Sequence, residues 1–283
     1  MPPRSQPTAR QERLGAELRK LREAAGMTAR EAAALLGTNP MHMSHLETGR
    51  AGISEERLRR LAANCECSDA KLIDALVAMA TDRTRGWWEE YRGVLPAVFL
   101  DQAELEHHAL GVRDISVVGV PGLLQTEHYA RAVFSFRVPE LPSKELEPRV
   151  EHRMRRRSIL ERDPGTPYEG IIHEAALRIR VGTRETALAQ LHSILEFSER
   201  DNVAVRVIPM EAEQFAGAYS VMLLAAGAVP SLDTLQRDVP DGTGFMTAEA
   251  QLVKARAMFD KVKAFSLGTK ATRDLVREVM RNL

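Results

Sequence analysis

Hydrogen-bonding side chains are concentrated between residues 28 and 50. Hydroxyl, imidazole and amide groups exchange hydrogen bonds with the edges of DNA bases, and a thioether packs against a thymine methyl group. The residues expected to meet base edges are Pro40, Met41, His42, Ser44 and His45. Hydroxyl, amide and guanidinium groups also bind phosphate, and the residues expected to do so are Thr28, Arg30, Asn39 and Arg50. This segment is therefore a candidate surface for double-stranded DNA.

A second set of polar residues lies in the middle of the chain, where it is compatible with a pocket for a small-molecule effector. The set comprises Gln125, Thr126, Tyr129, His173 and Glu174. The adjacent His173 and Glu174 are also compatible with a proton-transfer pair, although we favour a structural hydrogen-bonding pair at the end of a strand. The same surface could instead serve dimerisation or the docking of a partner protein.

The common catalytic motifs do not occur in the sequence, which has no P-loop, GxSxG, HExxH or GxGxxG. His42 and His45 are spaced to share a metal ion, but no cysteine or carboxylate cluster completes a tetrahedral set. Cys65 and Cys67 are compatible with a redox pair, although one core cysteine and one surface thiol is the interpretation we favour. We therefore expect no catalytic residue, no cofactor and no metal.

The formal net charge of the 283-residue chain is zero, but the charge is unevenly distributed. Residues 1–62 carry eleven basic and seven acidic side chains, a net of +4, so the remainder carries −4. A basic module on a mildly acidic body is typical of a DNA-binding head. No run approaches the roughly 18 apolar residues of a membrane span, and the N-terminus lacks the apolar stretch of a secretory signal. We expect a cytoplasmic protein without a membrane partner.

The elements that would position the first set of residues are helices. Thr28 and Glu31 form a capping box that opens a helix of about 29–36, and Asn39 with Pro40 opens another of about 40–48. Gly37 separates these two helices, which makes them a helix-turn-helix; a helical bundle with a solvated polar face is the alternative. Further helices are expected over 10–25 and after caps at Ser54 and Ser68. The expected buried side chains include Leu18, Ala32, Leu35, Leu36, Met43, Leu46, Leu58, Leu61, Cys65, Leu72, Ile73, Leu76 and Val77.

This all-α, five-helix head, over residues 10–80, resembles the Xre (Cro/CI-like) helix-turn-helix family. The resemblance rests on Leu18-Arg19-x-x-Arg22, Gly26-Met27-Thr28, Glu31-Ala32-Ala33, Leu36-Gly37 and Met43-Ser44-x-Leu46-Glu47-x-Gly49. It implies that the helix at 40–48 enters the major groove of DNA.

The sequence pattern of residues 86–283 predicts an α+β domain with a small mixed sheet of about five strands. The strands are expected at 114–120, 168–174, 203–208, 218–225 and 231–237. Helices are expected at about 86–92, 96–109, 126–135, 143–162, 185–200, 247–265 and 270–282. The basic run from Arg153 to Arg157 is compatible with phosphate binding, although we favour a solvated helix face.

This second region resembles the C-terminal domain of actinobacterial Xre-type regulators, which is described as antitoxin-like or of unknown function. The resemblance rests on Trp88-x-x-Tyr91-Arg-Gly-x-Leu95-Pro96, Val120-Pro-Gly-Leu-Leu-Gln-Thr-Glu127-x-Tyr129, Arg149-Val-Glu-x-Arg153 and His173-Glu174-Ala-Ala-Leu177-Arg178. It implies a cytoplasmic transcription regulator, often paired with a small acidic partner protein.

Together these patterns predict a sequence-specific transcription regulator. Because one small head buries too little surface for a specific site, we expect a homodimer that binds a palindromic operator. A small partner protein or a ligand would modulate it through the second domain. The alternative is an antitoxin-like module whose main role is to sequester a small partner protein.

Overall fold

The computed structural model describes residues 6–213, 221–239 and 242–283. The chain divides into two compact units, Met1–Glu89 and Glu90–Leu283. We call them the N-terminal unit and the C-terminal unit and describe each by itself. A short 3-10 helix, η1 (Trp87–Tyr91), lies at the boundary between the two units in the sequence, where a helix is expected at about 86–92.

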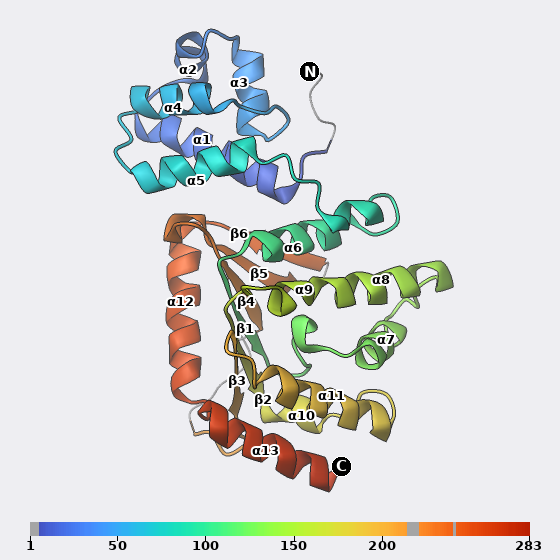
Figure 1. Ribbon diagram of the computed structural model, residues 1–283. Coiled ribbons are helices and arrows are strands. Elements are labelled where there is room, and N and C mark those ends of the chain that lie inside the picture. The colour runs from blue at the N-terminus through green and yellow to red at the C-terminus, as the bar shows by residue number, and fades with distance from the viewer. Residues whose placement is uncertain (1–5, 214–220, 240–241) are drawn as a thin grey trace. The chain divides into compact units, whose positions relative to one another are not determined.

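The N-terminal unit consists of helices and loops, and the predicted five-helix head is confirmed for its described residues (Figure 1). Each helix begins at a capping side chain that accepts a hydrogen bond from the first turn. The fifth is capped by Asp69 instead of the predicted Ser68. The helices are α1 (Ala9–Ala24), α2 (Ala29–Leu35), α3 (Pro40–Glu47), α4 (Glu55–Asn64) and α5 (Ala70–Thr81).

The core of this unit consists of one apolar stripe from each helix. Leu18, Met43 and Leu61 are at most 1% exposed. The prediction that Leu35 is buried is wrong, because it is 38% exposed and Ala33 is fully buried in its place. The buried side chains at the end of α2 are Ala32, Ala33 and Leu36, which lie on one side of the helix. The helical repeat places residue 35 beside this buried face, where it remains partly in contact with solvent.

The C-terminal unit is an α+β domain around a six-stranded mixed sheet, which confirms the predicted fold class with one strand more than expected. Its strands are β1 (Gly111–Ser116), β2 (Tyr168–His173), β3 (Val203–Ile208), β4 (Met222–Ala226), β5 (Thr234–Val239) and β6 (Gly242–Met246). Its helices are α6 (Ala97–His108), α7 (Glu127–Ser135), α8 (Ser143–Arg156), α9 (Ser158–Glu161), α10 (Glu174–Arg178), α11 (Arg184–Phe197), α12 (Glu249–Ala264) and α13 (Thr269–Asn282). Two further 3-10 turns are η2 (Gly122–Leu124) and η3 (Pro230–Leu232).

The sheet has a parallel half and an antiparallel half that meet at β1. The strand order is β3-β2-β1-β4-β5-β6. Strand β1 runs parallel to β2, with Val112 opposite Tyr168, and antiparallel to β4, with Asp114 opposite Leu223. Strands β4, β5 and β6 continue as antiparallel neighbours.

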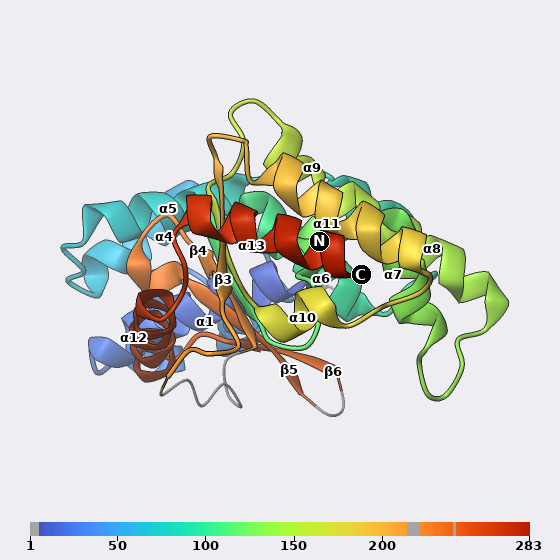
Figure 2. The same cartoon turned by 90° about the horizontal axis from the view of Figure 1, so that it is seen from below.

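Helices cover both faces of this sheet (Figures 1 and 2). One face carries Val112, Tyr168 and Val205 and packs against α7, α9, α10, α11 and α13. The opposite face carries Ile115, Ile171 and Leu235 and packs against α12, whose Phe259 is fully buried. The alternation of side chains along each strand sends successive residues to the two cores.

Several element boundaries differ from the sequence prediction. The strand expected at 231–237 begins at Thr234, because Ser231 and Leu232 belong to the 3-10 turn η3. Strand β1 starts earlier than expected because Gly111 and Val112 pair with β4, and the chain leaves the sheet after Ser116, whose hydroxyl donates to the carbonyl of Gly119. The helix expected over 143–162 ends at Arg156, and α9 follows. Residues 218–220 of the expected strand at 218–225 lie outside the described residues, and the part that is described forms β4.

Across the residues that the structure describes, every helix is too short or too polar to span a lipid bilayer.

Candidate nucleic-acid interface

Helices α2 and α3 are positioned by their capping side chains. The Thr28 hydroxyl accepts a hydrogen bond from the backbone N–H of Glu31, and the Glu31 carboxylate accepts from the backbone N–H of Thr28. At α3, the Asn39 side-chain oxygen accepts from the backbone N–H of His42 at 2.8 Å, and Pro40 occupies the first turn. The predicted capping box and the predicted start of α3 are therefore confirmed.

Helix α3 presents one apolar face to the core and one polar face to solvent. Met43 is fully buried and Leu46 is 2% exposed. On the outer side, Met41 is 71% exposed, Pro40 and Ser44 are exposed, and His42 and His45 are half-buried. The side chains that the sequence assigned to base edges thus come together on the accessible side of one helix.

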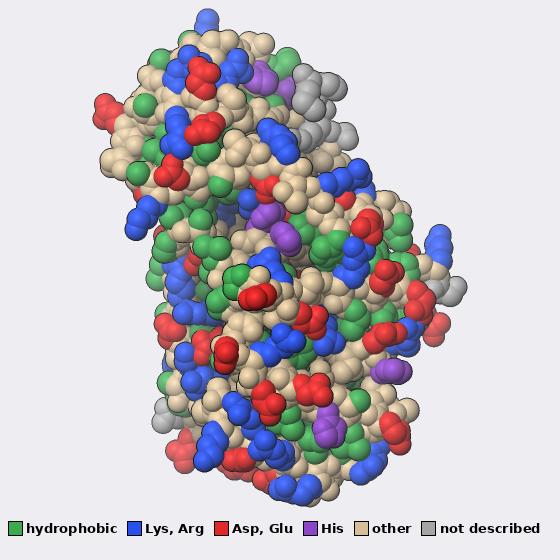
Figure 3. Space-filling view, in the orientation of Figure 1, with side chains coloured by type: hydrophobic (Ala, Val, Ile, Leu, Met, Phe, Trp, Pro, Cys, Tyr) green, Lys and Arg blue, Asp and Glu red, His purple; other side chains and the backbone are tan. Residues whose placement is uncertain are grey.

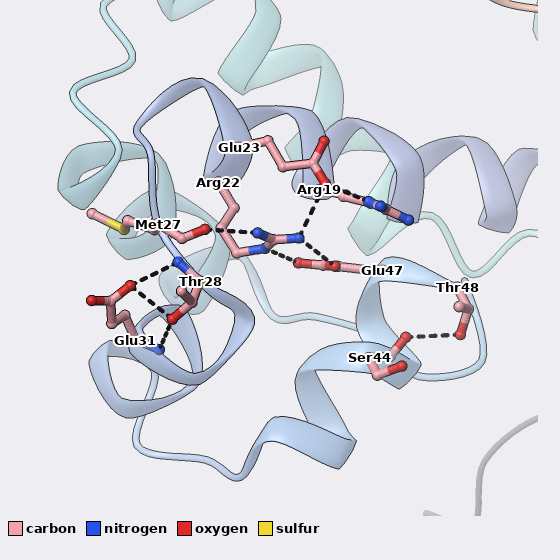
Figure 4. Close-up of polar contacts among 9 residues, drawn as sticks. All are labelled: Arg19, Arg22, Glu23, Met27, Thr28, Glu31, Ser44, Glu47 and Thr48. Atoms are coloured by element: carbon pink, nitrogen blue, oxygen red, sulfur yellow. Dashed lines mark hydrogen bonds and ion pairs between the residues drawn. The ribbon is translucent and has the colours of Figure 1, made fainter.

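A buried ion pair fixes α3 against α1. Arg22 on α1 donates from Nε to Glu47 Oε1 at 2.5 Å and from Nη2 to Glu47 Oε2 at 3.0 Å, while its Nη1 donates to the carbonyl of Met27 at 2.7 Å (Figure 4). The side chains of both residues are about nine-tenths buried. The hydrogen bonds to Glu47 raise the pKa of Arg22 above its ordinary value. We call this arrangement the Arg22–Glu47 clamp.

Close backbone contact supports the clamp. A Cβ atom on Gly15 would lie 2.6 Å from the carbonyl oxygens of Leu46 and Glu47, so α1 approaches the end of α3 at a distance that only glycine allows. Gly49, which follows α3, has a φ of +72° and a similarly close contact with Gln11. The orientation of α3 is therefore set at its C-terminal end by backbone as well as by side chains.

The four residues predicted to bind phosphate have different environments. The Thr28 hydroxyl also donates to the Glu31 carboxylate, so both its hydrogen-bonding roles are already used within the cap. The backbone hydrogen bond from Thr28 lowers the pKa of Glu31, which keeps a negative charge at the start of α2. Asn39 uses its oxygen in the cap. Arg30 and Arg50 are exposed, and their guanidinium groups are the better placed of the four to meet a phosphate.

Ion pairing separates the basic side chains of the N-terminal unit into two groups. Six of them form ion pairs: Arg10, Arg13, Arg19, Lys20, Arg22 and Arg59. Within residues 6–89, seven basic side chains have no ion-pair partner: Arg30, Arg50, Arg57, Arg60, Lys71, Arg83 and Arg85. Basic and acidic side chains are interspersed on the visible face of the molecule (Figure 3). The unpaired positive charge of the described part of this unit is thus carried by six arginines and one lysine.

Arg57 and Arg60 are additional candidates that sequence reasoning did not assign to a site. Both lie on α4, where Arg59 pairs with Glu55 at 2.8 Å and with Asp74 at 2.9 Å. Helical spacing alone would also pair Arg60 with Glu56, four residues before it, so no sequence signal separates the free Arg60 from the paired Arg59. Arg57 has no acidic residue three or four positions away, so helical spacing does indicate that it is free.

The histidine and cysteine alternatives have little geometric support. Among the described residues, no group of three or more His, Cys, Asp or Glu side chains is arranged to hold a metal ion. Cys65 and Cys67 are free thiols. Burial raises the pKa of the Cys65 thiol above its ordinary value, which keeps it protonated and unreactive.

The second predicted set of residues divides between two places in the C-terminal unit. Gln125, Thr126 and Tyr129 surround the turn before α7: the Gln125 amide donates to the carbonyl of Val120 at 2.7 Å, and the Tyr129 hydroxyl accepts from the Val120 N–H. Thr126 caps α7. These contacts fix the backbone of the Pro-Gly-Leu-Leu-Gln-Thr segment.

His173 and Glu174 lie at the junction of β2 and α10. His173 Nδ1 accepts from the backbone N–H of Ala175, which caps α10. Glu174 is 3% exposed and accepts from Arg178 and from the backbone N–H of Met210. Each polar group therefore has a local structural partner. Of the five predicted residues, Gln125 alone lines the large cavity described below.

The fold and these sites define a helix-turn-helix protein, a class that binds DNA. The helix-turn-helix domain family matches residues 13–76, which include α2 and α3. The family described as a domain of unknown function (DUF5753) matches residues 99–278, and the chain belongs to this family. No curated protein and no solved structure matches the chain.

Proposed function

We propose that the protein is a sequence-specific transcriptional regulator of the Xre type. The observation that carries the proposal is the outer face of α3, where Met41, Ser44 and His45 are accessible while Met43 and Leu46 anchor the helix in the core. In helix-turn-helix proteins the second helix of the motif lies in the major groove. An accessible thioether, hydroxyl and imidazole supply the contacts that distinguish base pairs there.

Phosphate contacts would orient this helix on the duplex. Arg30 at the start of α2 and Arg50 after α3 flank the motif, and neither has an ion-pair partner among the described residues. Thr28 and Asn39, at the caps of the two helices, would add weaker contacts through hydroxyl and amide groups. This division assigns affinity to the arginines and sequence preference to α3.

A dimer follows from the size of the head. One helix-turn-helix contacts a half-site, and two related copies bind half-sites about one turn of DNA apart. We propose that the C-terminal unit supplies the dimer contacts and receives a small partner protein or ligand that changes DNA binding. The proposal contains no catalytic step, and a role on DNA would place the protein in the cytoplasm with the nucleoid.

The experiment that tests the function selects binding sites from random duplex DNA with the purified full chain. A palindromic motif that is then protected in a footprint by the protein alone supports a regulator. Enrichment of no motif, together with stable co-purification of a small protein independent of DNA, would support the antitoxin-like alternative. A variant with both Met41→Ala and His45→Ala is the control, since it should lose the motif while keeping its fold.

A further inference from the structure

The C-terminal unit contains an open cavity of about 690 Å³ next to α8. We call it the arginine cavity, because Arg137, Arg149, Arg153 and Arg156 all line it. Its other walls come from α6, from the turn before α7 and from strands β1, β4, β5 and β6. The volume lies within the roughly 300–1,000 Å³ of sites for small molecules.

The strands provide a polar floor for this cavity. Asp114 of β1 is opposite Leu223 of β4, which is opposite Gln236 of β5. Residues directly opposite each other in a sheet point to the same face, so these side chains share one surface. All three line the cavity, and Asp114 and Gln236 are at most 8% exposed.

Three of the four arginines, Arg149, Arg153 and Arg156, come from one face of α8. Residues 149, 153 and 156 follow a helical spacing of four and three, so their side chains lie above one another. Arg149 is 5% exposed and Arg156 is 4% exposed. The interpretation of this basic stretch as a solvated helix face is therefore wrong for Arg156, and the cavity lies where that face was expected to meet water.

All three of these arginines of α8 have side-chain partners. Arg156 donates to both carboxylate oxygens of the buried Glu106, at 2.7 and 2.5 Å, which neutralises its charge. Arg153 donates to the Gln125 side-chain oxygen at 2.7 Å and stacks on Phe134 at 4.3 Å from the ring centre.

Arg149 is the group that points to a ligand. Its Nη2 donates to Glu145 at 2.9 Å, and the guanidinium lies 4.9 Å from the ring centre of Phe99. Its Nε and Nη1 are buried and have no hydrogen-bond partner in the part of the chain that the structure describes. Buried donors without partners are costly, and a bound anion would satisfy them.

The arginines of α8 make the local potential positive enough to affect a neighbouring histidine. His152 on the same helix is fully buried, and burial followed by the charges of Arg156, Arg153 and Arg155 lowers its pKa to about 3. The imidazole is therefore neutral at physiological pH, and it adds no further positive charge that would need compensation.

We propose that the arginine cavity binds a small organic anion. A carboxylate or phosphate group would accept hydrogen bonds from Arg149 and Arg153, since charge-assisted bonds of this kind are the strong ones. An apolar body of the ligand would contact Phe99 and Phe134, which line the cavity beside these arginines. This inference rests on the proposed function in one respect: the proposed function includes a ligand of the C-terminal unit, and the inference gives the chemical class of that ligand.

The test is isothermal titration calorimetry of the full chain with benzoate, phenyl phosphate and benzyl alcohol. Saturable binding of benzoate or phenyl phosphate at one site per chain, with no binding of neutral benzyl alcohol, supports the proposal. Failure of both anions to bind at millimolar concentration overturns it. Tighter binding of a glutamate-rich peptide than of either small anion also overturns it, because the site would then serve a protein partner.

Variants locate the binding. Arg149→Gln and Arg153→Gln should each lower the affinity for the anion about tenfold or more, because each removes charge-assisted hydrogen bonds. Arg137→Glu is a second test that does not disturb packing, since Arg137 is exposed at the rim. Arg277→Gln, an exposed arginine of α13 outside the cavity, is the matched control and should bind as the unaltered chain does.

Unchanged binding in Arg137→Glu, Arg149→Gln and Arg153→Gln overturns the assignment of the site. Thermal unfolding of each variant shows whether the fold is kept. The footprint on selected DNA, measured with the same preparations, reports the proposed function independently, so loss of anion binding with an intact footprint would refute only this inference.

Discussion

At the scale of single residues, the N-terminal unit separates charges that are already balanced from charges that are free. Arg19 is paired with Glu23 at 2.6 Å, and this hydrogen bond raises its pKa above the ordinary value. Arg50 is exposed and has no ion-pair partner in the described part of the chain. Net charge alone would treat the two as equal, whereas their geometry predicts different contributions to phosphate binding.

We expect Arg50→Ala to weaken binding to all DNA sequences and to reduce the slope of log K against log salt by about one. Each phosphate contact releases counterions from the duplex, so losing one contact lowers the salt dependence. Fluorescence anisotropy over a series of salt concentrations measures the slope. Arg19→Ala is the matched control and should leave the slope nearly unchanged; an unchanged slope in Arg50→Ala would refute its phosphate role.

We expect His45→Ala to change sequence preference more than non-specific affinity. An imidazole that reads a base edge discriminates between bases by about 1–3 kcal/mol, while its removal leaves the phosphate contacts intact. Site selection with the variant, compared with His192→Ala on the exposed side of α11, measures the effect. A uniform loss of affinity across sequences would show that His45 does not read bases.

At the scale of secondary-structure elements, the Arg22–Glu47 clamp determines how α3 is held. Arg22→Met should destabilise the N-terminal unit by about 3 kcal/mol, because it leaves the nine-tenths buried Glu47 carboxylate without a partner. Urea denaturation followed by helical circular dichroism measures the loss. The double variant Arg22→Met with Glu47→Leu should recover much of the stability; if it costs as much as the sum of the single changes, the pair is not coupled.

Helix α8 gives the C-terminal unit a predictable response to acid. His152 packs edge-on against Tyr91 and Phe99, and its pKa in the folded protein is about 3, below its ordinary value of 6.5. The unfolded chain therefore binds a proton that the folded chain does not, and stability falls as pH drops below 6.5.

Between pH 6.5 and 5.5 this group should remove about 1 kcal/mol of stability. Denaturant unfolding at the two pH values measures the change. His152→Gln lacks the titrating group and should show a correspondingly smaller loss; equal losses in the two proteins would show that other groups dominate.

The element scale also shows which features sequence could predict. Thr28, Asn39 and Gly37 give correct helix boundaries because caps and turns depend on neighbours only a few residues away. Strand β6 contains Gly242, Thr243 and Gly244, a composition with weak strand preference, and it forms because β5 offers a free edge. Pairing of this kind depends on distant residues that periodicity does not report.

The same reasoning applies to the candidate sites. The polar face of α3 could be predicted because it follows from one helical repeat. The arginine cavity could not, since it joins α8 to strands that lie more than twenty-five residues before it and more than sixty residues after it. Gln125 was expected in a pocket with His173 and Glu174, but it instead contacts Arg153.

At the scale of the whole molecule, the two N-terminal units of a dimer would bind the two half-sites of one palindromic operator. We expect the full chain to bind an operator with two intact half-sites roughly 100-fold more tightly than one with a scrambled half-site, since several base contacts worth about 1–3 kcal/mol each are lost. Electrophoretic mobility shift with both duplexes measures the ratio, and sedimentation measures the mass of the free protein. Equal affinity for the two duplexes would favour a monomer on DNA.

The order of strands in the sheet has a consequence for synthesis of the chain. Strand β1 needs β4, more than one hundred residues later, as its second neighbour. The N-terminal unit, by contrast, is complete at Glu89. At translation rates of roughly 5–20 residues per second, about 10 to 40 s separate the emergence of the two complete units. The DNA-binding unit of a nascent chain can therefore fold while the ribosome is still producing the domain that would control it.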